Sequence, residues 1–454
     1  EGAVLLQNGG GILPLKEDAR LAVIGAMAAD LRFQGAGSSH IQPTKLSQPL
    51  DCLPAATYAP GCTGRGGTTD ALLQQVREAA AQADVAVVFA GLPGQAESEG
   101  FDRDHMRLPE GHLRMIDAAA GANPNTVVVL LSGGVVECPW ADRVRGILYM
   151  GLPGQAGGEA VADLLYGRVN PSGRLAESWP YRYEDVPSAE IYDRTTDALY
   201  PEGLYVGYWY YDKAGVPVRW PFGYGLSYTT FAYADLRVTG DTATVTVQNT
   251  GRVAGAEVVQ LYLRTPQDGL HRPVRELKGF QKVFLQPGER MTVTFRLDDR
   301  CFAVWQDGWK VPAGEYTACV GGTLPVPDWQ AGSWYERCEG RPNRADWERM
   351  LGRAYVPPVL QKGSFTMDNT VEEMRDYSLL MELMYKATES VIARGFGGKK
   401  DYDNPDFRMR MASSAGGPLR SMQISGGIRG GVIPGMLEMA NGHFLRGLLK
   451  MVRG

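Results

Sequence analysis

The sequence has 454 residues, of which 44% are hydrophobic and 21% charged, a composition that can bury several cores and excludes a disordered chain. The formal net charge is −5 with both signs dispersed, so no basic stripe indicates nucleic acid and no polybasic run indicates an anionic membrane. No run of about 18 apolar residues predicts a membrane span. We therefore expect a globular protein of roughly two to four domains that acts on a neutral small molecule.

The six cysteines are scattered and show no C-x-x-C or Cys/His spacing that would bind zinc. We expect separate thiols, with a Cys52–Cys62 disulfide as the less favoured alternative. Val23-Ile-Gly25-Ala-Met-Ala does not fit the dinucleotide-binding fingerprint. No metal and no cofactor are predicted.

Residues 1–180 alternate between short apolar runs and helical stretches. The apolar runs are continuous, as in a sheet buried on both faces, and cover 21–25, 85–90, 126–131 and 145–149. Helices are expected over 68–83, 109–121 and 156–166, with Gly121 and Gly167 as stop signals. This alternation predicts a mostly parallel α/β sheet.

The first residues, Val4-Leu5-Leu6 followed by Asn8-Gly9, are interpreted as the last turn of a helix with a glycine stop. No helix start precedes them, so we interpret the sequence as a portion of a longer protein. The ends indicate no compartment, and a cytoplasmic location is favoured over secretion.

Three further regions follow the α/β region. Residues 181–230, rich in Pro, Gly and Tyr, are expected to be a linker that packs on its neighbours. Residues 231–325 carry short alternating strands, which predict a β-sandwich of fibronectin type III or immunoglobulin-like form. Residues 326–454 are rich in methionine; Thr370-Val-Glu-Glu373 predicts a capping box, and Val371, Met374, Tyr377, Met381 and Met384 recur on one helical face.

The residues suited to chemistry lie in the loop 91–109, which leaves the carboxyl end of one predicted strand and enters the next helix. It contains the string Glu97-Ser-Glu-Gly-Phe-Asp-Arg103, followed by Leu108-Pro109. Open α/β sheets usually bind ligands at this edge. From composition alone, however, a solvated loop pinned by an Asp102–Arg103 or a Glu–Arg pair is the favoured interpretation.

The loop resembles the acid/base loop of family-three β-glycosidases, which tends to read E-x-E-G-x-D-R before L-x-L-P. Other segments agree with that family in order: Gly35-Ala-Gly-Ser-Ser39, Asn170-Pro-Ser-Gly-Arg-Leu175, Phe222-Gly-Tyr-Gly-Leu-Ser227 and Gly255-Ala-Glu-Val-Val-Gln260. The resemblance covers about residues 1–325. It implies an α/β sandwich domain followed by a fibronectin-like domain.

In that family the second glutamate of the loop is the general acid and then the general base, so the resemblance assigns this role to Glu99. Such a carboxyl needs burial or a neighbouring negative charge to raise its pKa, and Glu97 is the expected neighbour. Asp102 and Arg103 are expected to fix the loop, with direct sugar contact as the alternative. The resemblance also places Ser39 and His40 near the sugar, while a lone loop histidine is more often structural.

The family's nucleophile is an aspartate in a Ser-Asp-Trp-like motif on a separate barrel domain, and this motif is absent from the sequence. Pro327-Asp-Trp329 and Ala345-Asp-Trp347 resemble it superficially, but both lie beyond the predicted sandwich and are rejected. The resemblance therefore implies a retaining hydrolase of β-glucosides or related glycosides whose N-terminal barrel lies outside this chain. The chain alone is expected to be inactive.

Two other functions remain open. One is a non-catalytic carbohydrate-binding or scaffold protein, favoured if Glu99 is exposed and paired with Arg103 away from any groove. The other is a phosphorylase of the same fold, against which the retained glutamate argues, because such members tend to use a histidine on the barrel. The expected partners are a β-glycoside or oligosaccharide and the barrel; the sequence indicates no nucleic acid and no membrane, and leaves a homo-oligomer open.

Overall fold

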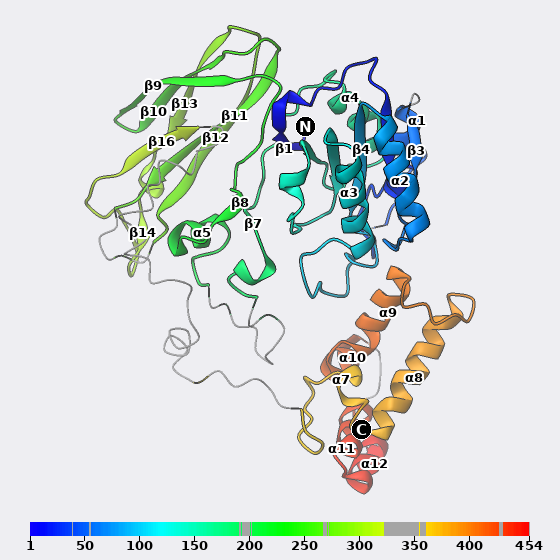
Figure 1. The fold of residues 1–454 in the computed structure, drawn as a ribbon. Coiled ribbons are helices and arrows are strands. Elements are labelled where there is room, and N and C mark those ends of the chain that lie inside the picture. The colour runs from blue at the N-terminus through cyan, green and yellow to red at the C-terminus, as the bar shows by residue number, and fades with distance from the viewer. Residues whose placement is uncertain are drawn as a thin grey trace.

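The computed structural model describes residues 1–38, 40–53, 56–189, 192, 200, 202–266, 270, 272–321, 354, 360–425 and 430–453. Within these residues it contains an α/β unit, two antiparallel sheets that form a β-sandwich, and a C-terminal group of helices (Figure 1). This confirms the predicted fold class of α/β plus all-β.

The α/β unit is built on a six-stranded sheet in the order β1-β6-β5-β4-β2-β3. Its strands are β1 (Val4–Asn8), β2 (Leu21–Ile24), β3 (Thr57–Ala59), β4 (Val85–Gly91), β5 (Thr126–Leu131) and β6 (Gly146–Tyr149). Strands β2 to β6 pair in parallel, and β1 pairs antiparallel with β6. The continuous apolar runs are fully buried in β2, β4 and β5, as a sheet covered on both faces requires.

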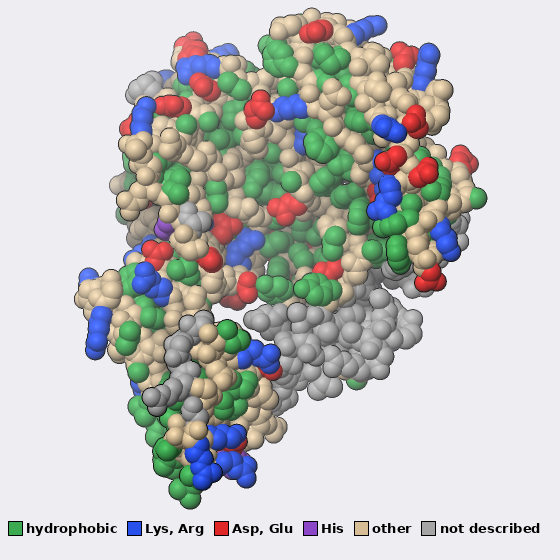
Figure 2. Space-filling model, turned by 180° about the vertical axis from the view of Figure 1, so that it is seen from behind, with side chains coloured by type: hydrophobic (Ala, Val, Ile, Leu, Met, Phe, Trp, Pro, Cys, Tyr) green, Lys and Arg blue, Asp and Glu red, His purple; other side chains and the backbone are tan. Residues whose placement is uncertain are grey.

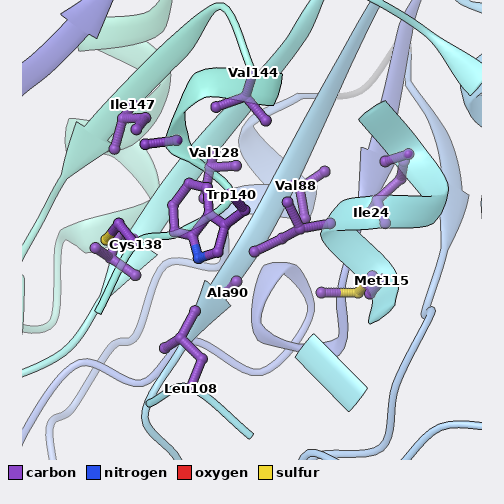
Figure 3. Close-up of a cluster of buried hydrophobic side chains, with 14 of the residues drawn as sticks. Ile24, Val88, Ala90, Leu108, Met115, Val128, Cys138, Trp140, Val144 and Ile147 are labelled. Atoms are coloured by element: carbon purple, nitrogen blue, oxygen red, sulfur yellow. The ribbon is translucent and has the colours of Figure 1, made fainter. Parts of the chain in front are cut away.

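Helices cover both faces of this sheet. They are α1 (Pro49–Cys52), α2 (Asp70–Gln82), α3 (Glu110–Ala122) and α4 (Gly157–Leu165). Helices α2 and α3 share a core with alternate strand residues such as Val88, and this core includes the buried Trp140 (Figure 3). Helix α4 packs on the opposite face against Val87 and its neighbours. The strands and helices predicted in this region are confirmed to within two residues at each end.

The prediction for the first residues is wrong. Val4–Asn8 forms strand β1, not the end of a helix. Leu5 is fully buried, and Asn8 closes the following turn by hydrogen bonds with the backbone of Leu13. A run of five residues carries too little periodicity to separate helix from strand, and pairing with β6 decides between them.

The expected linker contains structure of its own. It includes the helix α5 (Tyr208–Ala214) and the strand β8 (Val218–Trp220), which pairs with β7 (Trp179–Pro180) just before the expected linker. Trp179 and Trp220 meet edge to face, 5.6 Å between ring centroids, and both belong to the core shared with α2 and α3. This segment therefore packs on its neighbours, as predicted.

The β-sandwich consists of two three-stranded sheets, β13-β10-β9 and β12-β11-β16. Its strands are β9 (Phe231–Thr239), β10 (Thr242–Asn249), β11 (Gly255–Arg264), β12 (Arg275–Leu285), β13 (Arg290–Arg296) and β16 (Thr317–Gly321); β14 (Val304–Trp305) and β15 (Trp309–Lys310) form a small separate pair. Arg174, which precedes the sandwich, forms a buried ion pair with Glu257 of β11 at 2.7 Å.

The C-terminal helices are α7 (Val371–Met374), α8 (Leu379–Arg394), α9 (Pro405–Ala415), α10 (Leu419–Ser425), α11 (Val432–Ala440) and α12 (Phe444–Arg453). The predicted capping box is present: Thr370 and Glu373 exchange side-chain to backbone hydrogen bonds. Val371, Met374 and Met381 lie in the core of this group, whereas Tyr377 is exposed because the helix is interrupted between α7 and α8.

Among the described residues, no helix has both the length and the apolar character needed to cross a membrane.

The described cysteines are free thiols, so the Cys52–Cys62 disulfide is not formed. They are Cys52, Cys62, Cys138, Cys301 and Cys319.

Candidate functional site

The loop 92–109 begins where β4 ends and lies beside the loop that follows β2. The chain passes from β2 to β3 on one side and then returns to β4 on the other, so β2 and β4 flank a topological switch point. Ligands of open α/β sheets bind outside the carboxyl ends of the strands at such a point. The loops 25–48 and 92–109 therefore meet where this architecture favours a site.

Glu99 is held at this point by the backbone of the first loop. Ser38 N–H donates to Glu99 Oε2 at 2.7 Å, and Glu99 N–H donates to Ala36 O at 3.3 Å. Gly37 has φ of +107°, and a Cβ on it would lie 2.5 Å from the Glu99 Cβ, so only glycine permits this approach. The Glu99 side chain is exposed, and hydrogen bonding from Ser38 holds the pKa of its carboxyl below the usual value.

The Glu97 carboxylate holds the loop in place. Its carboxylate accepts from Gly133 N–H at 2.9 Å and forms an ion pair with Arg32 at 3.3 Å. The Arg32 guanidinium also donates to Glu97 O at 2.9 Å. The expectation that Glu97 raises the pKa of Glu99 finds no support, because the pKa of Glu99 is lowered and the Glu97 charge is neutralised by a buried arginine.

Asp102 and Arg103 fix the loop through different partners. Both terminal guanidinium nitrogens of Arg103 donate to Val135 O at 3.0 Å, which ties the loop to the segment after β5. Asp102 accepts from Tyr192 Oη–H at 3.1 Å. No ion pair between Asp102 and Arg103, or between Glu99 and Arg103, occurs among the described side chains.

Ser39 lies outside the described residues, so its predicted proximity to a sugar stays a prediction. His40 is half-exposed, and its Nδ1 lies 3.8 Å from Asp406 Oδ1 at the start of α9. Within the described part of the chain His40 thus faces the C-terminal helices, which sequence reasoning did not connect with this loop.

Sequence reasoning also missed Arg32, which clamps Glu97. It belongs to no motif that would mark it, and only the burial of its side chain, 8% exposed, identifies it. The two Asp-Trp pairs near residues 328 and 346 lie outside the described residues. No group of three or more metal-binding side chains is found within the described residues.

Two family models match the chain. The Glycosyl hydrolase family 3 C-terminal domain matches residues 3–208, which contain the site, and the Fibronectin type III-like domain matches residues 257–323. The two matches fall on the α/β unit with the segment after it and on the β-sandwich.

Two curated relatives are 46% identical to the chain over the aligned residues. The chain is 46% identical over 341 residues to the thermostable beta-glucosidase B of Acetivibrio thermocellus, covering 71% of this chain and 45% of that protein. It is 46% identical over 345 residues to an exo-alpha-(1->6)-L-arabinopyranosidase of Bifidobacterium breve, covering 71% and 46%. The chain therefore spans less than half the length of these relatives.

Two solved beta-glucosidase structures are also similar to this chain. The crystal structure of a family 3 beta-glucosidase from Bifidobacterium adolescentis superposes with a TM-score of 0.68 at 44% identity, covering 71% of this chain and 50% of that one. Beta-glucosidase 3B from Thermotoga neapolitana, in complex with alpha-D-glucose, gives 0.63 at 31% identity, covering 71% and 51%. The chain thus carries the glycosyl hydrolase family 3 C-terminal domain over residues 3–208 and a fibronectin type III-like domain over residues 257–323.

Proposed function

We propose that this chain supplies the general acid/base of a retaining glycoside hydrolase, with Glu99 in that role. The observation that carries the proposal is the placement of an exposed Glu99 carboxylate at the switch point of the sheet, fixed there by the Ser38 backbone. Its neighbours Glu97 and Arg103 are occupied in holding the loop.

The nucleophile comes from a barrel domain outside this chain. A retaining hydrolase needs its two carboxyl groups about 5–5.5 Å apart on opposite sides of the anomeric carbon. Glu97 does not fit this role, because Arg32 and Gly133 N–H already bind its carboxylate. The lengths of the curated relatives, of which this chain covers under half, leave room for such a domain.

The two chemical steps require opposite protonation states of Glu99. In the first, protonated Glu99 transfers its proton to the leaving oxygen as the bond from that oxygen to the anomeric carbon breaks and the nucleophile attacks the carbon. In the second, the Glu99 carboxylate takes a proton from water, whose oxygen displaces the nucleophile.

The surroundings of Glu99 favour each state in turn. A barrel and a sugar covering the carboxyl, with the charged nucleophile nearby, would raise its pKa for the first step. Once the nucleophile is esterified its charge is gone, and the Ser38 N–H stabilises the carboxylate that the second step needs.

The substrate class is a terminal β-D-glucoside or a pyranoside with the same orientation of the leaving oxygen. An α-L-arabinopyranoside, the kind of substrate in the name of the Bifidobacterium breve relative, also presents its leaving oxygen equatorially. Both therefore suit protonation by one carboxyl from the same direction.

The test joins this chain to the N-terminal half of the Acetivibrio thermocellus relative and compares the fusion with Glu99→Ala on p-nitrophenyl β-glucoside and α-L-arabinopyranoside, each with and without azide. Removing a general acid/base lowers turnover by about 10²–10⁴-fold, and azide should restore it by forming a β-glycosyl azide. Glu110→Ala, which removes an exposed glutamate just beyond the loop, is the matched control. Activity of Glu99→Ala equal to that of the parent fusion would refute the assignment.

A non-catalytic carbohydrate-binding protein is the second candidate. The exposure and lowered pKa of Glu99 favour it, because a resting general acid usually has a raised pKa. Glu99 is not, however, paired with Arg103. An active fusion whose Glu99→Ala variant keeps sugar affinity and loses turnover would exclude this candidate.

A further inference from the structure

The acid/base loop is covered from outside the α/β unit by α9 and the turn before it. In the space-filling view the C-terminal helices project from the molecule and meet it along one side (Figure 2). In the ribbon view α9 is the helix of this group nearest to the α/β unit (Figure 1). Helix α9 and the turn before it meet three loops at the carboxyl edge of the sheet.

The sequence of α9 explains which face it presents. Asn404 caps the helix by accepting from Asp406 N–H and Phe407 N–H, and Pro405 occupies the first helical position. Phe407 and Met411, four residues apart, are buried in the core of the C-terminal helices. Pro405, Arg408 and Met409 lie on another face, three to four residues apart, and this face meets the loop.

Met409 lies beside Gly37 and Gly100, the two glycines next to Glu99. A Cβ on Gly37 would lie 3.3 Å from Met409 Sδ, and a Cβ on Gly100 would lie 2.9 Å from Met409 Cγ. Met409 therefore fills the space that a side chain at Gly37, which faces Glu99, or at Gly100, which follows Glu99, would occupy. Gly100 has φ of +92°, which a side chain would strain even without this contact.

Arg408 holds the same loop at two points. Its guanidinium lies over the Phe101 ring, 3.8 Å from the centroid, and donates to Gln95 O at 3.2 Å. A half-buried cation over an aromatic ring is a contact that lysine reproduces only in part.

Two further contacts tie the turn before α9 and its first residues to other loops. Arg65, which follows β3, pairs with Asp403 at 2.9 Å and with Asp401 at 3.5 Å. Asp406 lies beside His40 of the loop after β2. The helix thus rests on the loops after β2, β3 and β4 together.

We propose that α9 is a positioning element for the acid/base, and that Arg408 and Met409 keep Glu99 in the orientation that protonates the leaving oxygen. The inference rests on the proposed function of Glu99. It assigns to the C-terminal helices a part in catalysis by the matched domains, through the loop that carries the carboxyl and without touching the substrate.

The first measurement uses the chain as it is. Hydrogen exchange of the backbone amides of residues 92–109 is compared between the wild type, Arg408→Ala and Met409→Ala. Loss of either contact should speed exchange of this segment by about tenfold, because local opening costs less free energy. The matched controls are Arg446→Ala on α12 and Met422→Ala, which removes a partly buried methionine packed against the core of the helices; both are expected to leave the segment unchanged.

The second measurement uses the active fusion and a series of aryl β-glucosides. Phenols of low pKa leave without protonation, whereas basic leaving groups depend on the general acid. Arg408→Ala and Met409→Ala should lower kcat/KM for poor leaving groups by about 10–100-fold and change little for 2,4-dinitrophenyl glucoside. Arg408→Lys and Met409→Leu, which keep part of each contact, should recover part of the loss.

Glu99→Ala, measured in parallel, separates the two possible failures. If it shows no dependence on the leaving group, the proposed function fails, and the inference fails with it. If Glu99→Ala shows the dependence while the α9 variants lose activity equally on all substrates, or lose none, the positioning role alone is refuted. Unchanged exchange of residues 92–109 in both α9 variants also refutes it.

Discussion

His112, a buried histidine at the start of the helix that follows the loop 92–109, gives a prediction for the dependence of stability on pH. His112 of α3 is 1% exposed, and its Nδ1 accepts from Gly91 N–H, at the end of β4, at 3.2 Å. Since Nδ1 accepts, the neutral ring carries its proton on Nε2. Burial lowers the pKa of His112 from 6.5 to about 4.

This pKa shift determines how the free energy of unfolding changes with pH. Above pH 6.5 the ring is neutral in both the folded and the unfolded chain. As the pH falls towards 4, the unfolded chain binds a proton that the folded chain refuses, so the free energy of unfolding decreases. At about 1.36 kcal/mol per pKa unit, the loss reaches about 3 kcal/mol near pH 4 and grows no further below it.

Urea unfolding of the wild type and His112→Gln at pH 7, 6, 5 and 4.5, roughly spanning the titration window, tests this prediction. Glutamine can still accept from Gly91 N–H but does not titrate, so the stability of the wild type relative to the variant should fall by about 2.5 kcal/mol across the series. His443→Gln, which removes an exposed histidine, should keep a constant difference. Parallel profiles for the wild type and His112→Gln would refute the reasoning.

Three other changes have expected outcomes. Gly37→Ala should strain the backbone by about 1–3 kcal/mol and displace Glu99. The kcat/KM of the fusion should therefore fall by about 10–100-fold. Gly64→Ala is the control and should have little effect, because Gly64 lies in open space and has no positive φ. Arg174→Ala should leave the buried Glu257 carboxylate unpaired and cost about 3–5 kcal/mol in urea unfolding, far more than replacing both partners by apolar residues. Cys138 should resist thiol reagents in the native chain, because complete burial raises the pKa of its thiol, and rapid labelling without unfolding would contradict this.

The fold could be predicted from the sequence where the signals were long and periodic. The apolar runs of β2, β4 and β5, and the alternation in β10, identified the two kinds of sheet. Strand β1 was missed because five residues give no usable period, and its antiparallel partner β6 lies 140 residues away.

The candidate site was predicted only as far as its motif reached. The string around Glu99 marked the loop, but nothing in it shows that Glu97 is neutralised by Arg32. The packing of Met409 against Gly100 joins residues 309 positions apart, and methionine at that position is typical of ordinary packing. Such contacts are specified by the tertiary structure and leave no local pattern in the sequence.

The contacts that hold the loop around Glu99 stabilise it in any enzyme that uses this carboxyl. Loops at the carboxyl edge bury little apolar area and belong to the least stable parts of a fold. Here the loop is tied by Arg32 to the loop after β2, by Arg103 to the segment after β5, and by Arg408 to α9. Because each tie restrains the same backbone, losing one leaves the others partly effective, and the effects of removing two should not be additive. A carboxyl that must donate and then accept a proton at one point in space gains from such shared restraint, since both transfers depend on the same orientation.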